Sequence, residues 1–249
     1  MRIGSLWIHP YTLRLSLGVL LGAAWLIWRA PRWGVSRAAI PALLWMLLAS
    51  TLLLGRLGYV LGNPLYFSQN PGAILALGRV GGLYGGSAFV GGLLAAMWFV
   101  RRVHLPLARL LTWLTPAVLL TAAGAWWGCA AAGCAWGQDA VTPVWLIAET
   151  RDLYGLLASR YATATLGMGW ALLMVGAAVA LGRCGGAALA LYWVGEAALT
   201  TLRADPVPLW GAYRVDTLLS LTLAACLWCV FWIGRPQRVA SRNHPMSLS

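Results

Sequence analysis

Residues 38–61 read AAIPALLWMLLASTLLLGRLGYVL, and Arg56 is the only charged side chain in this otherwise apolar run. A helix rises about 1.5 Å per residue, so about 20 apolar residues cross the roughly 30 Å hydrocarbon core of a bilayer. The whole chain shares this character, since 61% of its 249 residues are hydrophobic and 10% are charged. Soluble domains carry about 25% charged residues. The sequence therefore predicts an all-α integral membrane protein with a single domain, residues 1–249.

Seven apolar segments have the length and composition of membrane-spanning helices. They are residues 12–28, 38–61, 80–100, 110–127, 164–182, 185–202 and 213–234. Alternate connections and the tail 235–249 together hold ten arginines, which lie in 29–37, 101–109, 183–184 and the tail. Basic residues collect on the cytoplasmic side of a membrane protein. The pattern thus predicts seven transmembrane helices, with the N-terminus outside, the C-terminus in the cytoplasm and a multi-pass location in the plasma membrane.

Two outer connections are longer than simple turns. Residues 62–79 contain two Asn-Pro pairs followed by a short apolar run, which predicts an amphipathic arm at the outer interface. Residues 128–163 form a long outer loop of mixed composition, and long ordered loops are often functional. The third span contains Gly82, Gly86 and Gly91, which favour close helix packing over a groove for a lipid tail.

The start of the long loop has an unusual composition. Residues 123–139 read AGAWWGCAAAGCAWGQD, in which Gly128, Gly133 and Gly137 permit close approach of another backbone. Asp139 is the only side chain in this stretch that is charged at neutral pH, so the loop lacks groups that could act on a ligand. Cys129 and Cys134 either pair as a disulfide on an oxidising side or remain free thiols.

Charged residues inside the predicted spans indicate where a polar site could form. Arg56 and Glu196 lie at similar depth below the outer surface, and Glu196 shares a helix face with Arg203, seven residues further on. One interpretation is a polar pocket lined by these three residues and Tyr192. The other is a structural Arg56–Glu196 ion pair together with an arginine that reaches the interface. Arg214 and Asp216 are expected at the outer interface, as both lie at the end of the last span.

Other kinds of site find little support in the sequence. The net charge is +12, but the arginines lie between apolar runs rather than on one face, so they do not indicate nucleic acid binding. The three histidines have no metal-ligand spacing, and there is no GxSxG nucleophile motif. No metal and no cofactor are expected.

Four stretches, in this order, resemble the prolipoprotein diacylglyceryl transferases of bacteria over residues 12–234. They are GRLGYVLGNPLYFSQNP, GGLYGGSAFVGGLLA, GCAAAGCAWG and LYWVGEAALTTLRADPVPLWG. The family transfers the diacylglyceryl group of phosphatidylglycerol to the cysteine thiol of a lipoprotein precursor, leaving a thioether and glycerol phosphate. The resemblance implies a place in the bacterial inner membrane, with phosphatidylglycerol and lipoprotein precursor signal peptides as partners.

The resemblance also divides the chain's residues into two groups. The loop glycines Gly128, Gly133 and Gly137 match the family's signature loop, and Arg56 matches its RxGY motif. Candidates for holding lipid or phosphate are Arg56, Arg160, Tyr192 and Arg203. Six other positions match functional residues of the family but are substituted. Ser16 stands for a tyrosine, Gly86 for a histidine, Trp126 and Glu196 for arginines, Cys134 for an acidic residue, and Cys129 lies at the loop's Asn or Cys position.

Three hypotheses follow from these matches. The first is a working transferase in which Arg56, Arg160 and Arg203 take over from the missing arginines. The second is an inactive family member that binds lipid or a lipoprotein precursor. The third is a small transporter that uses Arg56 and Glu196 as an intramembrane pair. The loss of the signature cations favours impaired or absent activity, because a phosphate beside Glu196 is repelled.

Overall fold

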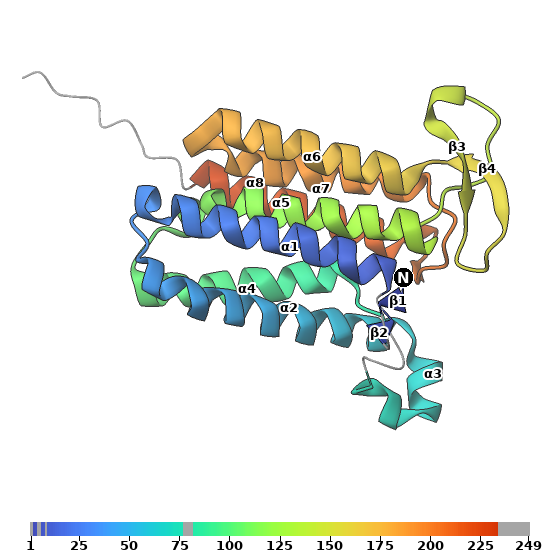
Figure 1. Ribbon diagram of the computed structural model, residues 1–249, viewed down its shortest axis with the longest axis horizontal. Helices are drawn as coiled ribbons and strands as arrows, with labels where there is room; N and C mark the ends of the chain where they lie inside the picture. Colours follow the sequence, from blue (N-terminus) through green and yellow to red (C-terminus); the bar gives the residue numbers. More distant parts are fainter. Residues whose placement is uncertain (1, 4–5, 8, 77–81, 234–249) are drawn as a thin grey trace, which may run out of the picture.

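The computed structural model describes residues 2–3, 6–7, 9–76 and 82–233 (Figure 1). Within these residues, seven long helices lie side by side as an elongated bundle. They are α1 (Pro10–Arg29), α2 (Ile40–Gly62), α4 (Gly85–Val103), α5 (Leu107–Ala132), α6 (Thr163–Leu181), α7 (Gly186–Thr201) and α8 (Val215–Ile233). Each predicted span corresponds to one of these helices, so the mainly helical fold is confirmed.

Five helical stretches in the described part of the chain are long and apolar enough to cross a membrane. They are Pro10–Trp33, Arg37–Gly62, Leu107–Ala132, Thr163–Leu181 and Val215–Ile233. The other two long helices are α4, whose last turn contains Arg101 and Arg102, and α7, which has 16 residues. They pack against α2 and α8 respectively. The count of seven crossings therefore stays a prediction.

The two ends of the bundle differ in their connections (Figure 1). At the end where α1 begins, which we call the loop end, lie the short helix α3 (Pro64–Gln69) and the antiparallel hairpin of β3 (Ile147–Arg151) and β4 (Leu157–Tyr161). The opposite end, which we call the turn end, has short links. These contain the 3-10 turns η1 (Ala30–Trp33), η2 (Arg37–Ala39) and η5 (Gly182–Cys184).

Smaller elements complete the loop end. The remaining 3-10 turns are η3 (Pro71–Ile74) and η4 (Val144–Leu146), and two further hairpins pair β1 (Arg2–Ile3) with β2 (Leu6–Trp7) and β5 (Leu209–Trp210) with β6 (Tyr213–Arg214). The described part of the predicted arm consists of α3 and η3, while residues 77–79 lie outside the described residues. The predicted tail 235–249 also lies outside them.

The predicted outer loop needed correction. It was expected to start at residue 128, but α5 continues to Ala132, and Gly133 then ends the helix in the left-handed conformation with φ +69°. The rest of the loop contains the β3–β4 hairpin, which apolar run length alone did not indicate. Five paired positions from Ile147–Tyr161 to Arg151–Leu157 fix its register.

Small residues let the helix backbones approach closely. A Cβ atom at Gly18 in α1 would lie 2.6 Å from the Leu120 carbonyl oxygen in α5, and one at Gly91 in α4 would lie 2.2 Å from the Ser50 oxygen in α2. A Cβ atom at Gly86 would lie 2.2 Å from Leu219 of α8. The backbone contacts at Gly18 and Gly91 leave no room for a side chain, whereas Gly86 meets the flexible end of the Leu219 side chain. The packing interpretation is therefore confirmed for Gly91.

The helix α5 occupies the centre of the bundle and packs against α1, α6 and α7. Its Trp113 and Leu119 are among the most buried side chains of the core, together with Leu26 of α1 and Leu189 of α7. By contrast, many leucines on α1 and α2 are exposed, as expected for helices whose outer faces contact lipid. The central position of α5 brings its C-terminal turns, with Trp126, to the polar residues of α7.

Candidate functional site

Arg56 near the end of α2 is buried and binds the backbone of the arm. Its Nε donates to the Ile74 oxygen at 2.9 Å, Nη1 to the Gly82 oxygen at 3.1 Å and Nη2 to the Ala73 oxygen at 2.6 Å. Its guanidinium also lies 5.1 Å from the ring centre of Phe67 in α3. Arg56 thus holds the arm and the start of α4 against α2. The structure records no ion pair of Arg56 with Glu196 among the described residues, and Glu196 instead accepts hydrogen bonds from Trp126 and Tyr192.

The glycines of the signature loop accommodate the chain's own backbone. A Cβ atom at Gly133 would lie 2.5 Å from the Asp152 oxygen, and one at Gly137 would lie 2.2 Å from the Tyr161 oxygen. At Gly128 it would lie 2.7 Å from the ring of Tyr11 in α1. The loop therefore packs tightly against the β3–β4 hairpin and α1, which explains its glycines without any ligand.

Cys129 and Cys134 form a disulfide, so the first of the two alternatives for this pair holds in the structure. Their Cα atoms are 4.7 Å apart, and the bridge joins the last turns of α5 to the loop that follows. Cys129 also packs against the small apolar cluster around Trp126. The bridge therefore fixes the start of the loop beside that indole.

Arg160 on β4 is buried between two carboxylates. Its Nε donates to Asp139 Oδ1 at 2.8 Å, and its Nη1 lies 3.1 Å from Asp152 Oδ2. Asp152 also accepts hydrogen bonds from the backbone N–H groups of Tyr154 and Leu156, both at 2.9 Å. Arg160 thus links the hairpin to the signature loop, and its charge is already neutralised by Asp139 and Asp152.

The carboxyl group of Asp152 gives this hairpin a pH dependence. Burial tends to raise its pKa, but the hydrogen bond from Leu156 N–H and the contact with Arg160 outweigh burial and hold the pKa below its ordinary value. A depressed carboxyl pKa stabilises the fold above the unfolded-state pKa of about 3.9, and this contribution is lost as the pH falls through the folded-state pKa.

We therefore expect Asp152→Asn to lower the thermal midpoint at neutral pH, and we expect its difference from wild type to shrink below about pH 4. Thermal unfolding in detergent, followed by circular dichroism between pH 7 and pH 3, measures this difference. Glu149→Gln is the matched control, because Glu149 on β3 is exposed. A difference that stays constant across this range would contradict the assigned role of the carboxylate.

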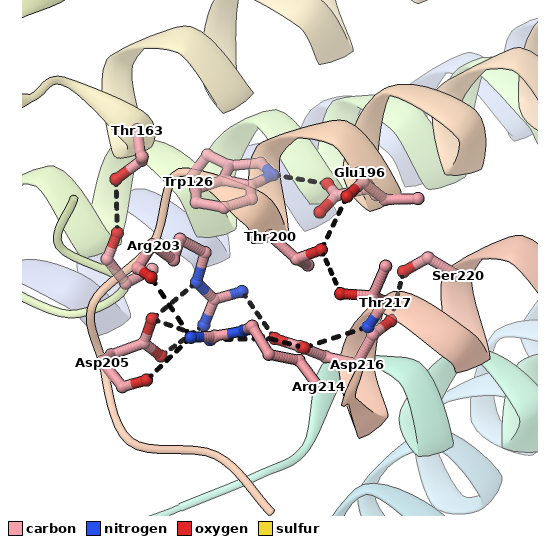
Figure 2. Close-up of polar contacts among 12 residues, drawn as sticks. Trp126, Thr163, Glu196, Thr200, Arg203, Asp205, Arg214, Asp216, Thr217 and Ser220 are labelled. Atoms are coloured by element: carbon pink, nitrogen blue, oxygen red, sulfur yellow. Dashed lines mark hydrogen bonds and ion pairs between the residues drawn. The ribbon is translucent and has the colours of Figure 1, made fainter. Parts of the chain in front are cut away.

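Trp126, Tyr192 and Glu196 form a buried hydrogen-bonded group between α5 and α7. Figure 2 shows the indole of Trp126 pointing toward Glu196. The indole Nε1 donates to Glu196 Oε1 at 2.7 Å, and the hydroxyl of Tyr192 donates to the same oxygen. The indole ring lies against Gly167 of α6, where a Cβ atom would be 2.4 Å from ring carbons. The position that the resemblance assigns to a phosphate-binding arginine thus holds a neutral ring that binds a carboxyl group.

Four charged residues next to this group form what we call the ion-pair cluster: Arg203, Asp205, Arg214 and Asp216 (Figure 2). Arg203 lies 2.5 Å from Asp205 Oδ2 and 3.5 Å from Asp216 Oδ2. Arg214 lies 3.3 Å from Asp205 Oδ1 and 3.2 Å from Asp216 Oδ1. Each arginine therefore contacts both carboxylates, and the cluster carries two charges of each sign.

The backbone around α7 and α8 holds the cluster in place. Arg214 Nη1 donates to the carbonyl oxygens of Arg203 at 3.2 Å and Asp205 at 3.1 Å. Asp216 lies in the first turn of α8, where a carboxylate interacts favourably with the helix dipole. The hydroxyl groups of Thr200 and Thr217 lie 2.6 Å apart and link α7 to α8 (Figure 2).

The structure brings together only some of the predicted site residues. Tyr192, Glu196 and Arg203 lie close to one another, and the Arg203 guanidinium is 6.0 Å from the ring centre of Trp126. Arg56 and Arg160 have separate partners in the arm and the hairpin. Arg214 and Asp216, which were expected to be merely interfacial, belong to the ion-pair cluster. Ser16 is exposed on α1.

Tyr84 is a candidate that sequence reasoning missed. It precedes α4, and its hydroxyl is buried without a hydrogen-bond partner among the described residues. The charges of Asp216, Arg203 and Arg214 act on this hydroxyl, which therefore lies near the ion-pair cluster. A tyrosine hydroxyl has an ordinary pKa of about 10, so it is a protonated donor at neutral pH. The sequence feature that could have indicated Tyr84 as a site residue is its position directly after Gly82-Leu83.

The site offers hydrogen-bond donors and carboxylates rather than metal ligands. Within the ranges that the structure describes, no three His, Cys, Asp or Glu side chains gather closely enough to hold a metal ion. The available groups are the Tyr84 hydroxyl, the two arginines of the cluster and the buried Glu196. Such a site can bind a polar head group and position a nucleophile, provided that the arginines exchange some contacts with the aspartates.

Residues 1–233 match the family model described as prolipoprotein diacylglyceryl transferase. A phosphatidylglycerol–prolipoprotein diacylglyceryl transferase of Dehalococcoides mccartyi is 31% identical over 137 residues, which are 55% of this chain and 52% of that protein. A protein of the same name from Pseudomonas putida is 34% identical over 123 residues, 47% of this chain and 44% of that protein. The chain thus spans about half the length of the curated relatives it matches.

Proposed function

This chain belongs to the prolipoprotein diacylglyceryl transferase family, and we propose that it binds phosphatidylglycerol and a lipoprotein precursor at the loop end of its bundle. We further propose that it transfers the diacylglyceryl group far more slowly than a member with the full set of basic residues. In this reaction the precursor's thiol loses its proton and its sulfur forms a bond to a glyceryl carbon. The carbon–oxygen bond to the phosphate breaks, and glycerol phosphate leaves with the electron pair.

The neutral ion-pair cluster is the observation that carries the slow rate. A departing phosphate needs positive charge, and charge-assisted hydrogen bonds from arginine are the usual means to stabilise it. Here Arg203 and Arg214 are already shared between Asp205 and Asp216. Each contact that a phosphate gains must therefore replace an existing one, so the net stabilisation is small.

The group around Trp126 supports the same conclusion. An indole N–H is a neutral donor, and it is bound to Glu196 at 2.7 Å. Glu196 adds a third carboxyl group next to the two aspartates of the cluster, so two arginines face three carboxyl groups. This region therefore has no formal surplus of positive charge for a phosphate.

A working transferase at full rate is the second candidate, and Tyr84 is the observation in its favour. Its buried hydroxyl has no hydrogen-bond partner among the described residues and can donate to an oxygen of the substrate. In that case Arg203 would leave an aspartate to bind the phosphate. The small transporter finds less support, because Glu196 binds Trp126 and Tyr192 rather than Arg56.

Binding at the loop end can be tested with Tyr84→Phe. We expect phosphatidylglycerol to raise the thermal midpoint of the purified wild-type protein, and we expect the variant to need several-fold more lipid for the same shift. Tyr154→Phe on the exposed hairpin is the control and should match wild type. Equal lipid dependence of all three proteins would remove Tyr84 from the binding site.

We also propose that the chain is one domain with seven crossings in the bacterial inner membrane, N-terminus outside and loop end facing outward. The arm 62–79 and the loop 128–163 then lie on the outer side, and the tail 235–249 lies in the cytoplasm. The arginines of the short links at the turn end support this orientation.

A reporter fused after Ser249 should therefore be cytoplasmic, and one inserted near Gln138 should be outside. Paired alkaline phosphatase and green fluorescent protein fusions in cells distinguish the two sides, because the former is active only outside and the latter fluoresces only inside. If both positions report the same side, the seven-crossing topology is wrong.

A further inference from the structure

A small cavity at the turn end lies far along the bundle from the ion-pair cluster. Its volume is about 20 Å³, and its walls include Trp25 and Arg29 of α1, Thr112 and Trp113 of α5, and Gly182 after α6. A cavity of at least about 10–15 Å³ holds one atom the size of a water oxygen. The cavity therefore has room for one oxygen atom. If that oxygen belongs to a larger group, the rest of the group lies outside the cavity.

Three side chains that line this cavity carry buried donors without an acceptor. Trp25 Nε1, Arg29 Nε and Trp113 Nε1 have no hydrogen-bond partner among the described residues. Trp113 is 1% exposed, so its N–H is fully removed from solvent by protein atoms. An unsatisfied buried donor is unfavourable, and three around one cavity are a rare arrangement in a native protein.

The charges around the cavity favour an anionic acceptor over water. Arg29 contributes a guanidinium, and the cavity walls contain no carboxylate side chain. Thr112 already donates its hydroxyl proton to the Ala108 oxygen at 2.7 Å, so it adds no further donor. The C-terminal end of α6 places carbonyl groups near Gly182, and their partial negative charge disfavours an anion. The positive charge of Arg29 offsets this effect. Water would leave one of the three donors unsatisfied, whereas an anionic oxygen can accept from all of them.

The surroundings of Arg29 extend this site to the surface. Its guanidinium lies 5.1 Å from the ring centre of Trp25 and 5.2 Å from that of Trp28, which is 62% exposed. Arg32 lies 5.9 Å from the same Trp28 ring and brings a second positive charge. Tryptophan and arginine at a helix end are typical of the level of lipid head groups.

We propose that this cavity, which we call the Arg29 site, binds one anionic oxygen of a phosphate group at the turn end. Arg29, Trp25 and Trp113 donate to that oxygen, and Arg32 lies near the rest of the phosphate. The phosphate belongs either to an anionic phospholipid or to free inorganic phosphate. This inference does not depend on the proposed transfer reaction, which concerns the opposite end of the bundle.

Thermal unfolding of the full chain in uncharged detergent, followed by circular dichroism, tests the Arg29 site. The probes are dioctanoyl phosphatidylglycerol, dioctanoyl phosphatidylcholine and inorganic phosphate at constant ionic strength. Trp113→Phe removes the buried N–H but keeps an aromatic ring, and Arg29→Gln removes the charge. Trp98→Phe and Arg102→Gln are matched controls, because this pair at the end of α4 has the same cation–π contact, 4.6 Å, outside the cavity.

We expect Trp113→Phe and Arg29→Gln to weaken the apparent affinity for the stabilising probe about tenfold or more. The two controls should stay within about twofold of wild type. Stabilisation by inorganic phosphate identifies a free anion, and stabilisation by phosphatidylglycerol alone identifies a lipid head group. Either result supports the site when Trp113→Phe and Arg29→Gln reduce it.

Two results would overturn the Arg29 site. One is that no probe stabilises the wild-type protein, and the other is that both cavity variants bind as tightly as the controls. Trp25→Phe serves as the replacement if Trp113→Phe is not folded in the absence of ligand. Tyr84→Phe separates the two ends of the molecule, because it should weaken lipid binding at the loop end and leave phosphate binding at the Arg29 site unchanged.

Discussion

Asp216→Ala will destabilise the protein by about 3–5 kcal/mol, because it leaves two buried arginines to share the single carboxylate of Asp205. Asp216 lies 3.5 Å from Arg203 and 3.2 Å from Arg214, and the side chains of the three residues are 11%, 16% and 19% exposed. The variant also loses a carboxylate from the first turn of α8. Unfolding in detergent with increasing denaturant, followed by circular dichroism, measures the change.

Two comparison variants make this prediction specific. Asp216→Asn keeps the shape and part of the hydrogen bonding, so we expect it to lie between wild type and Asp216→Ala. Glu149→Ala removes an exposed carboxylate on β3 and should change stability by no more than about 0.5 kcal/mol. If Asp216→Ala is as stable as Glu149→Ala, the cluster does not hold α7 and α8 together.

Replacing Trp126 and Glu196 together by arginine will raise diacylglyceryl transfer more than either single change. A charge-assisted hydrogen bond is worth about 1.5–3 kcal/mol. Two such contacts to the phosphate in the transition state change the rate by on the order of 10² to 10⁴, at about 1.4 kcal/mol per tenfold. The wild-type chain lacks both contacts, so its rate should be lower than that of a full-motif member by a factor of this size.

The structure explains why the double variant should exceed either single change. Trp126 Nε1 lies 2.7 Å from Glu196, so an arginine at 126 alone would pair with that carboxylate and remain neutralised. An arginine at 196 alone would face Trp126 and the nearby Arg203. Counted with the two aspartates of the cluster, Trp126→Arg alone gives no surplus of positive charge, Glu196→Arg alone a surplus of one, and the double variant a surplus of two. Equal activity of the double variant and wild type, with all proteins folded, would count against this explanation.

The helices could be predicted because apolar runs near 20 residues have few other structural solutions. The packing of Gly91 also followed from its small size on a membrane helix. The β3–β4 hairpin did not follow, because its five-residue strands have little periodicity. The extension of α5 to Ala132 was missed because its last turn is rich in glycine and alanine, which do not mark a helix end clearly.

The candidate site was predicted less completely than the fold. Counting residues from the outer end of each span indicated that Arg56 and Glu196 lie at a similar depth in the membrane. This count does not specify which faces of the two helices meet. Arg56 instead finds backbone carbonyls of the arm, and Glu196 finds Trp126 and Tyr192. The ion-pair cluster depends on how residues 203–216 fold back between α7 and α8, which sequence separation alone does not reveal.

The wild-type transfer rate is the most direct test of the proposed function. Purified protein in detergent with phosphatidylglycerol is mixed with a peptide that carries a lipobox cysteine, and mass spectrometry follows the diacylglyceryl peptide while a coupled assay follows glycerol phosphate. We predict measurable lipid binding but a rate about 10² to 10⁴ times lower than that of a full-motif member under the same conditions. A rate equal to that member's, and abolished by Arg203→Ala in a protein that remains folded, would contradict the account and show that the cluster's arginines bind the phosphate.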